Sequence, residues 1–138
     1  RTPRMRHERD ETTAKVMEVL DFTGLGRYAG EPAGSIPQEA QKRLAIGVAL
    51  MGEPRLLLLD EPTGGVGMGE TDEIIDLIGR VRERGITVCV IEHKMRMMMS
   101  LADRMVVLNF GVKIAEGEPR KVCEDPAVIE AYLGECIA

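Results

Sequence analysis

The pattern of hydrophobic and polar positions changes its period several times along the chain. Apolar residues at helical spacing predict a first helix over residues 8–22, which Gly24 ends. A short, continuous apolar run predicts a strand buried on both faces over residues 56–59, a second buried strand is predicted over 86–91, and a third strand over 105–108. Further helices are predicted over residues 70–84, 95–99, 119–123 and 127–133. One short strand is predicted over residues 112–115. This alternation predicts an α/β fold with a mainly parallel sheet and flanking helices.

Another helix is predicted to begin in the segment SIPQEAQKRL, residues 35–44, and to end near Gly52. Ser35 followed three residues later by Gln38 resembles a capping box, and Pro37 would sit in the first turn, where proline is tolerated. Glu39 would suit the positive end of the helix dipole. Locally, the segment therefore reads as the start of a capped helix.

The composition narrows the class of protein. The 138 residues suit one domain or a large piece of one, and with 3% aromatics and no Trp the core must be aliphatic. A formal net charge of -5 argues against nucleic acid as the main partner. No apolar run approaches the roughly 18–20 residues needed to cross a bilayer. Cys89, Cys123 and Cys136 have no metal-site spacing and are interpreted as reduced thiols.

Polar residues follow two of the predicted buried strands. Asp60 and Glu61 come directly after the first, and Glu92 and His93 come after the second. In open parallel sheets, ligands bind beyond the carboxyl ends of the strands. An Asp there can hold Mg²⁺, usually through water, and a neighbouring carboxylate can polarise an attacking water. Each residue alone is more often structural, but this order and spacing favour a phosphoryl-transfer site.

Three segments resemble those of the ATP-binding cassette (ABC) ATPases. LLLLDEPTGG, residues 56–65, resembles their Walker B segment and the loop that follows it. VIEHKM, residues 90–95, resembles their switch-histidine segment, and IPQEAQKRLAIGVAL, residues 36–50, occupies the place of their signature helix. The resemblance covers essentially the whole chain and implies a P-loop NTPase-like cassette fold.

The resemblance implies a role for each residue at the strand ends, with ATP and Mg²⁺ as the cofactors. Asp60 would be the Walker B aspartate associated with Mg²⁺ through water. Glu61 would be the catalytic carboxylate that polarises the attacking water. His93 would be the switch histidine that senses the γ-phosphate.

Two further groups would bind nucleotide by the same resemblance. Gly65 and Gly67 lie in the loop that links the two ATP sites of a cassette dimer. The signature positions, which in this family bind the phosphates of ATP held by the other subunit, are Ile36, Pro37, Gln38, Glu39, Ala40 and Gln41. A helix N-terminus suits that task because its N–H groups face the anion.

The end of the chain, from Ala102 to Glu135, resembles cassettes that serve branched-chain amino acid importers, and the solute assignment depends on this tail alone. Related urea-type and lipopolysaccharide-export cassettes stay open as alternatives. We expect three parts: residues 1–52 in the helical subdomain with the signature-like helix, 53–115 in the α/β core and 116–138 as the C-terminal helical tail.

Two departures from the family pattern affect the expected activity. The chain has no G-x-x-x-x-G-K-[ST] loop to cradle phosphates, so it looks like the C-terminal portion of a cassette and alone should be inactive. Glu39 replaces a signature glycine. A carboxylate within about 4 Å of a phosphate charge would be repelled by a few kcal/mol at an effective dielectric near 20, so we expect it to impair that half-site.

Three hypotheses follow. The first is a transport ATPase subunit that works as a homo- or heterodimer with a second cassette and with membrane permease subunits, on the cytoplasmic face of the cell membrane. The second is an incompetent remnant that acts at most as a non-hydrolysing partner, favoured by Glu39 and the missing phosphate loop. The third, an unrelated α/β binding domain, is disfavoured by the joint motifs.

Overall fold

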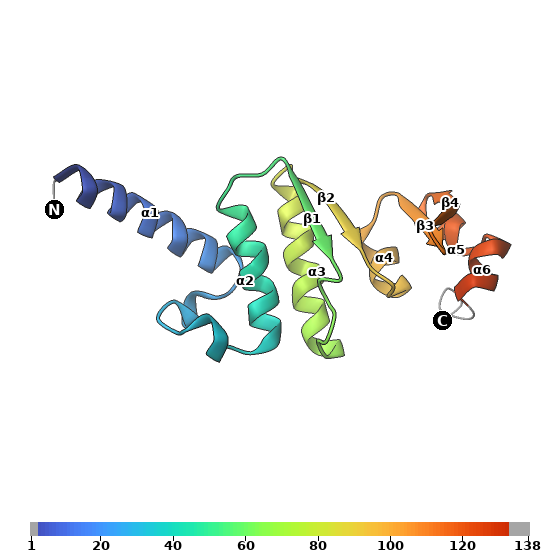
Figure 1. Cartoon of the computed structure of the whole chain (residues 1–138), viewed down its shortest axis with the longest axis horizontal. Coiled ribbons are helices and arrows are strands. Elements are labelled where there is room, and N and C mark those ends of the chain that lie inside the picture. Colours follow the sequence, from blue (N-terminus) through green and yellow to red (C-terminus); the bar gives the residue numbers. More distant parts are fainter. Residues whose placement is uncertain (1–2, 133–138) are drawn as a thin grey trace. The chain divides into compact units, whose positions relative to one another are not determined.

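The computed structural model describes residues 3–132, which form two compact units that divide between Val90 and Ile91 (Figure 1). The first unit contains α1 (Pro3–Phe22), η1 (Gly26–Tyr28), η2 (Ala33–Ser35), α2 (Gln38–Leu50), β1 (Leu56–Asp60), α3 (Met68–Glu83) and β2 (Thr87–Ile91), whose last residue opens the second unit. The second unit continues with α4 (Met95–Leu101), β3 (Met105–Asn109), β4 (Val112–Gly117), α5 (Pro119–Cys123) and α6 (Pro126–Tyr132). The predicted order of helices and strands is confirmed.

The first helix, α1, begins at Pro3, earlier than its apolar pattern predicted, and ends at Phe22 as expected. Gly24 adopts a φ of +72°, and its N–H donates to the carbonyl of Asp21. This left-handed conformation suits glycine and turns the chain out of the helix.

The predicted capping box at the start of α2 is wrong. The helix begins at Gln38, Pro37 is its N-cap rather than a first-turn residue, and no side chain caps it. Ser35 Oγ instead donates to the carbonyl oxygen of Pro32, inside the preceding turn. This local hydrogen bond of the Ser35 hydroxyl therefore replaces the helix cap that the spacing of Ser35 and Gln38 suggested.

Strands β1 and β2 pair in a two-stranded sheet, and Figure 1 shows their arrows running the same way with α3 as the connection. Just before the sheet begins, the N–H of Thr87 donates to the carbonyl of Arg55 at 3.0 Å. A strand, a helix and a parallel strand form the βαβ unit that the sequence predicted.

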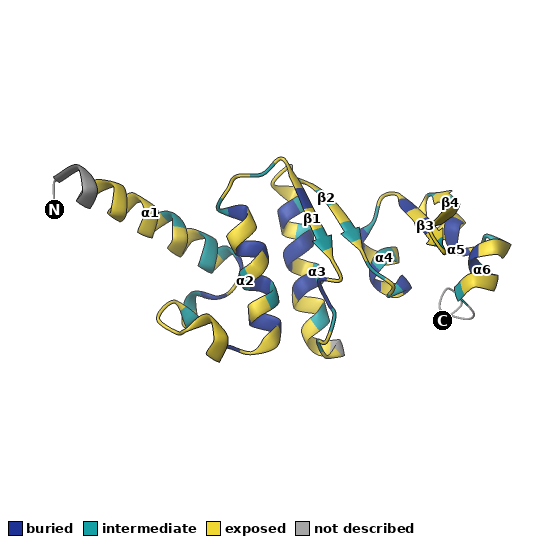
Figure 2. Cartoon of the chain, in the orientation of Figure 1, coloured by how far each residue is buried: buried dark blue, intermediate teal, exposed yellow. Residues whose placement is uncertain are grey.

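The prediction that β1 is buried on both faces is wrong for this chain (Figure 2). Leu57 is buried at 4% exposure, whereas Leu56 is 53% and Leu58 69% exposed. Side chains alternate between the faces of a strand, so one face of β1 is covered, and the described residues leave most of the other exposed.

The core of the first unit is built on α3. Ile74, Leu77, Ile78 and Val81 are all 0% exposed and recur at helical spacing on one side of the helix. A second cluster joins Leu25, Ile36 and Ala40, and partly buried side chains from α1, η1 and α2 pack against it, namely Leu20, Tyr28 and Leu44. These clusters fix where α2 lies against the rest of its unit.

One ion pair fastens α1 to the turn before β1. Lys15 Nζ donates a hydrogen bond to Glu53, and this bond, with the attraction between the charges, lowers the pKa of Glu53 below its usual range. A lowered carboxylate pKa stabilises the folded chain above the ordinary pKa, and this contribution is lost as the pH falls through the folded value. Both groups lie near the surface, so the contribution is small.

The second unit has its own core around an antiparallel hairpin. Strands β3 and β4 pair with Met105 opposite Gly117 and Val107 opposite Ala115, and the register shifts after Val107. Met105 and Val107 pack with side chains from the surrounding helices, namely Met95, Val122 and Val128. The methionine stripe of α4 thus contributes to this core through Met95.

Two sequence-based expectations concern the described residues as a set. Within residues 3–132, no helix is long and apolar enough to span a membrane. Among the described residues, Cys89, which is exposed, and Cys123, which is buried, form no disulfide. Cys136 lies outside the described residues.

Replacing Leu77 by Ala should lower the free energy of unfolding by about 2–5 kcal/mol, because it opens a cavity in a fully buried site. The matched variant Leu58→Ala removes the same atoms from a side chain that is 69% exposed, so it should change stability by only about 0.5 kcal/mol. Urea denaturation followed by circular dichroism measures both. Equal losses in the two variants would show that Leu58 is covered.

Candidate functional site

The chain turns sharply where β1 ends. Asp60 and Glu61 are both exposed there, and Glu61 adopts a φ of +44°. The carbonyl of Glu61 accepts the N–H of Gly64 at 3.0 Å, which closes the turn. A non-glycine residue in the left-handed region is uncommon and is found preferentially at functional sites. Both carboxylates thus stand at the strand end where the sequence predicted them.

The loop after this turn lies against the start of α2. Gly65 has a φ of +74°, and a Cβ atom there would stand 2.7 Å from Gln38 Nε2. The left-handed backbone therefore favours glycine at this position, and the loop lies beside the flexible end of the Gln38 side chain. At the end of the loop, Gly67 is the N-cap of α3, and its N–H donates to Glu70 Oε2 at 3.1 Å. The structure thus brings together two of the predicted groups, the loop and the signature-like segment.

A second contact links the same helix to the strand end. Lys42 Nζ, one turn into α2, approaches the carbonyl oxygen of Glu61 at 3.4 Å, a long hydrogen bond. The sequence analysis did not single out Lys42. Its position four residues after Gln38 places both side chains on one face of α2, which was the available signal.

The six signature positions divide into an inner and an outer group. Ile36 is 6% and Ala40 0% exposed, and both side chains belong to the core cluster around Leu25. Gln41 Nε2 donates to the carbonyl of Ile36 at 2.9 Å and fixes the turn. The exposed positions are Pro37, Gln38 and Gln41, together with the backbone N–H groups at the start of the helix.

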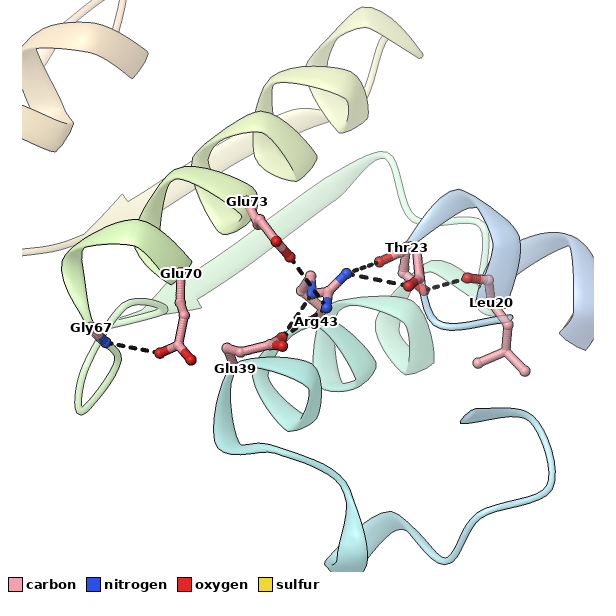
Figure 3. A network of polar contacts seen from close by, with 8 residues as sticks. Leu20, Thr23, Glu39, Arg43, Gly67, Glu70 and Glu73 are labelled. Carbon is pink, nitrogen blue, oxygen red and sulfur yellow. Dashed lines mark hydrogen bonds and ion pairs between the residues drawn. The ribbon is translucent and has the colours of Figure 1, made fainter. Parts of the chain in front are cut away.

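Glu39, the remaining signature position, is turned inward. Its side chain is 10% exposed, and Oε2 accepts two hydrogen bonds from Arg43, one from Nη2 at 2.8 Å and one from Nε at 3.1 Å (Figure 3). Such a fork-shaped, charge-assisted contact is strong and directional. The expectation that Glu39 presents an unpaired carboxylate to a phosphate therefore loses its basis, because the charge is neutralised within the chain.

Arg43 is the centre of a network that joins three helices. Its side chain is 7% exposed, and Nη1 donates to the carbonyls of Thr23 at 3.0 Å and Gly24 at 3.4 Å, beyond the end of α1. Nη2 also lies 3.3 Å from Glu73 Oε2 on α3 (Figure 3). The i,i+4 spacing of Glu39 and Arg43 was visible in the sequence and signals such a pair.

His93 belongs to the second unit, whereas Asp60 and Glu61 belong to the first. Its side chain is 61% exposed, and its Nδ1 lies 3.5 Å from Glu92 Oε2. The same Glu92 oxygen accepts the backbone N–H of His93 at 2.9 Å. The sequence placed Glu92 beside His93 but gave it no role.

The described residues contain no group of three or more His, Cys, Asp or Glu side chains that could enclose a metal ion. Mg²⁺ is commonly held by one or two carboxylates together with substrate phosphates and waters. The exposed carboxylate of Asp60 fits that mode, and the metal would take its remaining ligands from nucleotide and water.

Comparison with known proteins identifies relatives along nearly the whole chain. The high-affinity branched-chain amino acid transport ATP-binding protein BraF of Pseudomonas aeruginosa is 39% identical over 136 residues, which are 98% of this chain and 53% of that protein. LivG of Escherichia coli, with the same description, is 35% identical over the same shares. The chain thus spans about half the length of the curated relatives it matches.

Comparisons with solved structures and with a family profile find the same kind of protein as the comparison with curated relatives. The ADP conformation of MJ1267, an ATP-binding cassette of an ABC transporter, matches with a TM-score of 0.82 and 33% identity over 91% of this chain and 51% of that chain. A nucleotide-free ATP-binding cassette matches with a TM-score of 0.82 and 32% identity over the same shares. The family described as branched-chain amino acid ATP-binding cassette transporter matches residues 112–135. The predicted fold class is confirmed, and the chain belongs to the ATP-binding cassette family.

Proposed function

We propose that this chain is the C-terminal part of the ATP-hydrolysing subunit of an ABC importer. The observation that carries the proposal is the geometry at the end of β1. Two exposed carboxylates, Asp60 and Glu61, stand there with the signature-like start of α2 held beside them through Lys42 and Gln38. The 39% identity to a transport ATP-binding protein supports the same reading.

Each residue has one task in this proposal. Bound Mg-ATP supplies the phosphoryl group that is transferred to water. Asp60 would hold the metal, Glu61 would orient and polarise the attacking water, and His93 would contact the terminal phosphate. The N–H groups at the start of α2 and the loop with Gly65 and Gly67 face the nucleotide of a second cassette subunit.

The proposal extends to partners, place and solute. The subunit would work as a cassette dimer on membrane permease subunits, at the cytoplasmic face of the membrane. Branched-chain amino acids are the proposed solute, because the matched family profile covers residues 112–135 and the relatives carry that description.

The exposed face of β1 indicates that ATP hydrolysis requires a further part of the cassette, which would cover this face. Leu56 and Leu58 are 53% and 69% exposed, and an apolar sheet face of this kind is normally covered. We infer that it packs against the half of the cassette that carries the phosphate-binding loop, and that this chain alone neither binds ATP tightly nor hydrolyses it. The alternative is that the chain acts as a non-hydrolysing partner.

Joining the preceding half of the Pseudomonas aeruginosa relative to this chain should create a cassette that hydrolyses ATP, because it adds the phosphate-binding loop and covers the open sheet face. In that chimera, Glu61→Gln should retain ATP binding and lose turnover, since the amide no longer polarises water. Phosphate release measures turnover, and a fluorescent ATP analogue measures binding. A chimera that folds and binds ATP without hydrolysing it would instead support the non-hydrolysing partner.

The buried pair at the signature position leads to a separate prediction. Replacing Glu39 by Gly, although it restores the family's residue, should not raise turnover in the chimera. It should lower the free energy of unfolding by about 3–5 kcal/mol, because it leaves the buried Arg43 without its main partner. Glu73→Gln, which removes a partner that is 60% exposed, is the matched control and should cost about 1 kcal/mol or less. Higher turnover with unchanged stability in Glu39→Gly would mean that this carboxylate faces the nucleotide after all.

A further inference from the structure

Glu92 is a buried carboxylate to which the proposed ATPase chemistry gives no task. Its side chain is 0% exposed, although its neighbour His93 is 61% exposed. A buried ionised carboxylate is costly unless hydrogen bonds or opposite charges compensate it. The groups that compensate the charge of Glu92 therefore indicate what this carboxylate does.

The described contacts of Glu92 are directed at His93 and the residue after it. Glu92 Oε2 accepts the backbone N–H of His93 at 2.9 Å and that of Lys94 at 3.4 Å. These two amides immediately precede α4, whose N-cap, Lys94, forms no capping hydrogen bond with its side chain. The carboxylate therefore holds the backbone from which the imidazole projects.

The same oxygen also faces the ring. Nδ1 of His93 lies 3.5 Å from Glu92 Oε2, within the range of an ion pair and at the limit of a hydrogen bond. A carboxylate accepts hydrogen bonds and donates none, so it favours a proton on the ring nitrogen that faces it. Second partners of this kind commonly fix the tautomer and the orientation of a functional histidine.

We propose that Glu92 is a positioning residue for His93, which keeps the proton on Nδ1 and makes Nε2 the nitrogen that exchanges a proton with the site. With both nitrogens protonated, Nε2–H donates to a phosphate oxygen. In the neutral ring, Nε2 accepts a hydrogen bond instead. The role of Nε2 at a phosphate rests on the proposed function, whereas the position of the proton does not.

The tautomer can be measured in the 138-residue chain itself by two-bond proton–nitrogen correlation spectra of the imidazoles, recorded at about pH 8, above the ordinary histidine pKa of about 6.5. We expect His93 to be predominantly the Nδ1–H form. In Glu92→Leu, which leaves no acceptor opposite Nδ1, we expect the Nε2–H form to predominate, as it does in a free neutral imidazole. His7 is the other histidine of the chain, and a His7→Gln variant assigns the signals.

His7 also serves as an internal reference, because its Nε2 lies 3.1 Å from Glu11 on the exposed surface of α1 and Glu92→Leu should leave its spectrum unchanged. A wild-type His93 in the Nε2–H form would overturn the proposal even if the variant failed to fold. An unchanged His93 tautomer in a folded Glu92→Leu variant would also overturn it, since a purely backbone role predicts that result. A chimeric cassette without ATPase activity would count against the proposed function and leave this measurement standing.

Discussion

The arrangement of the first unit depends on the hydrogen bonds and ion pairs of one buried group, the guanidinium of Arg43. It binds Glu39 within α2, the carbonyls of Thr23 and Gly24 after α1, and Glu73 on α3. A buried cation is tolerated only when its donors are satisfied, so these partners must assemble together. Because the network sets the position of α2, it also sets where Gln38 and Lys42 meet the turn after β1. The geometry of the candidate site is thus a consequence of a charge pair in the core.

Much of this arrangement was predictable from local pattern. Continuous apolar runs followed by charged residues located β1 and β2 with Asp60 and His93 at or beyond their ends, because strand ends and strand periods are encoded locally. The orientation of Glu39 was not predictable in the same way. Comparison with a family glycine suggested an outward carboxylate, whereas a tertiary partner, Arg43, turned it inward. The failed cap at Ser35 has a local origin instead, since its hydroxyl donates to the carbonyl of Pro32 in the preceding turn.

The open face of β1 shows a second limit of sequence reasoning. A run of leucines predicts that a strand is buried. It does not predict which segment or chain covers that strand. Within the described residues, the face that contains Leu57 is covered, whereas Leu56 and Leu58 are exposed. The pattern therefore predicted the environment of the complete sheet and not that of this chain.

The exposed leucines also determine how the chain should behave in solution. Unpaired strand edges beside apolar side chains are the surfaces through which proteins aggregate. The net charge of -5 opposes this association only through long-range repulsion, which salt screens. The isolated chain should therefore aggregate more readily as the ionic strength rises. The salt concentration used in purification then decides how much of the chain stays dispersed.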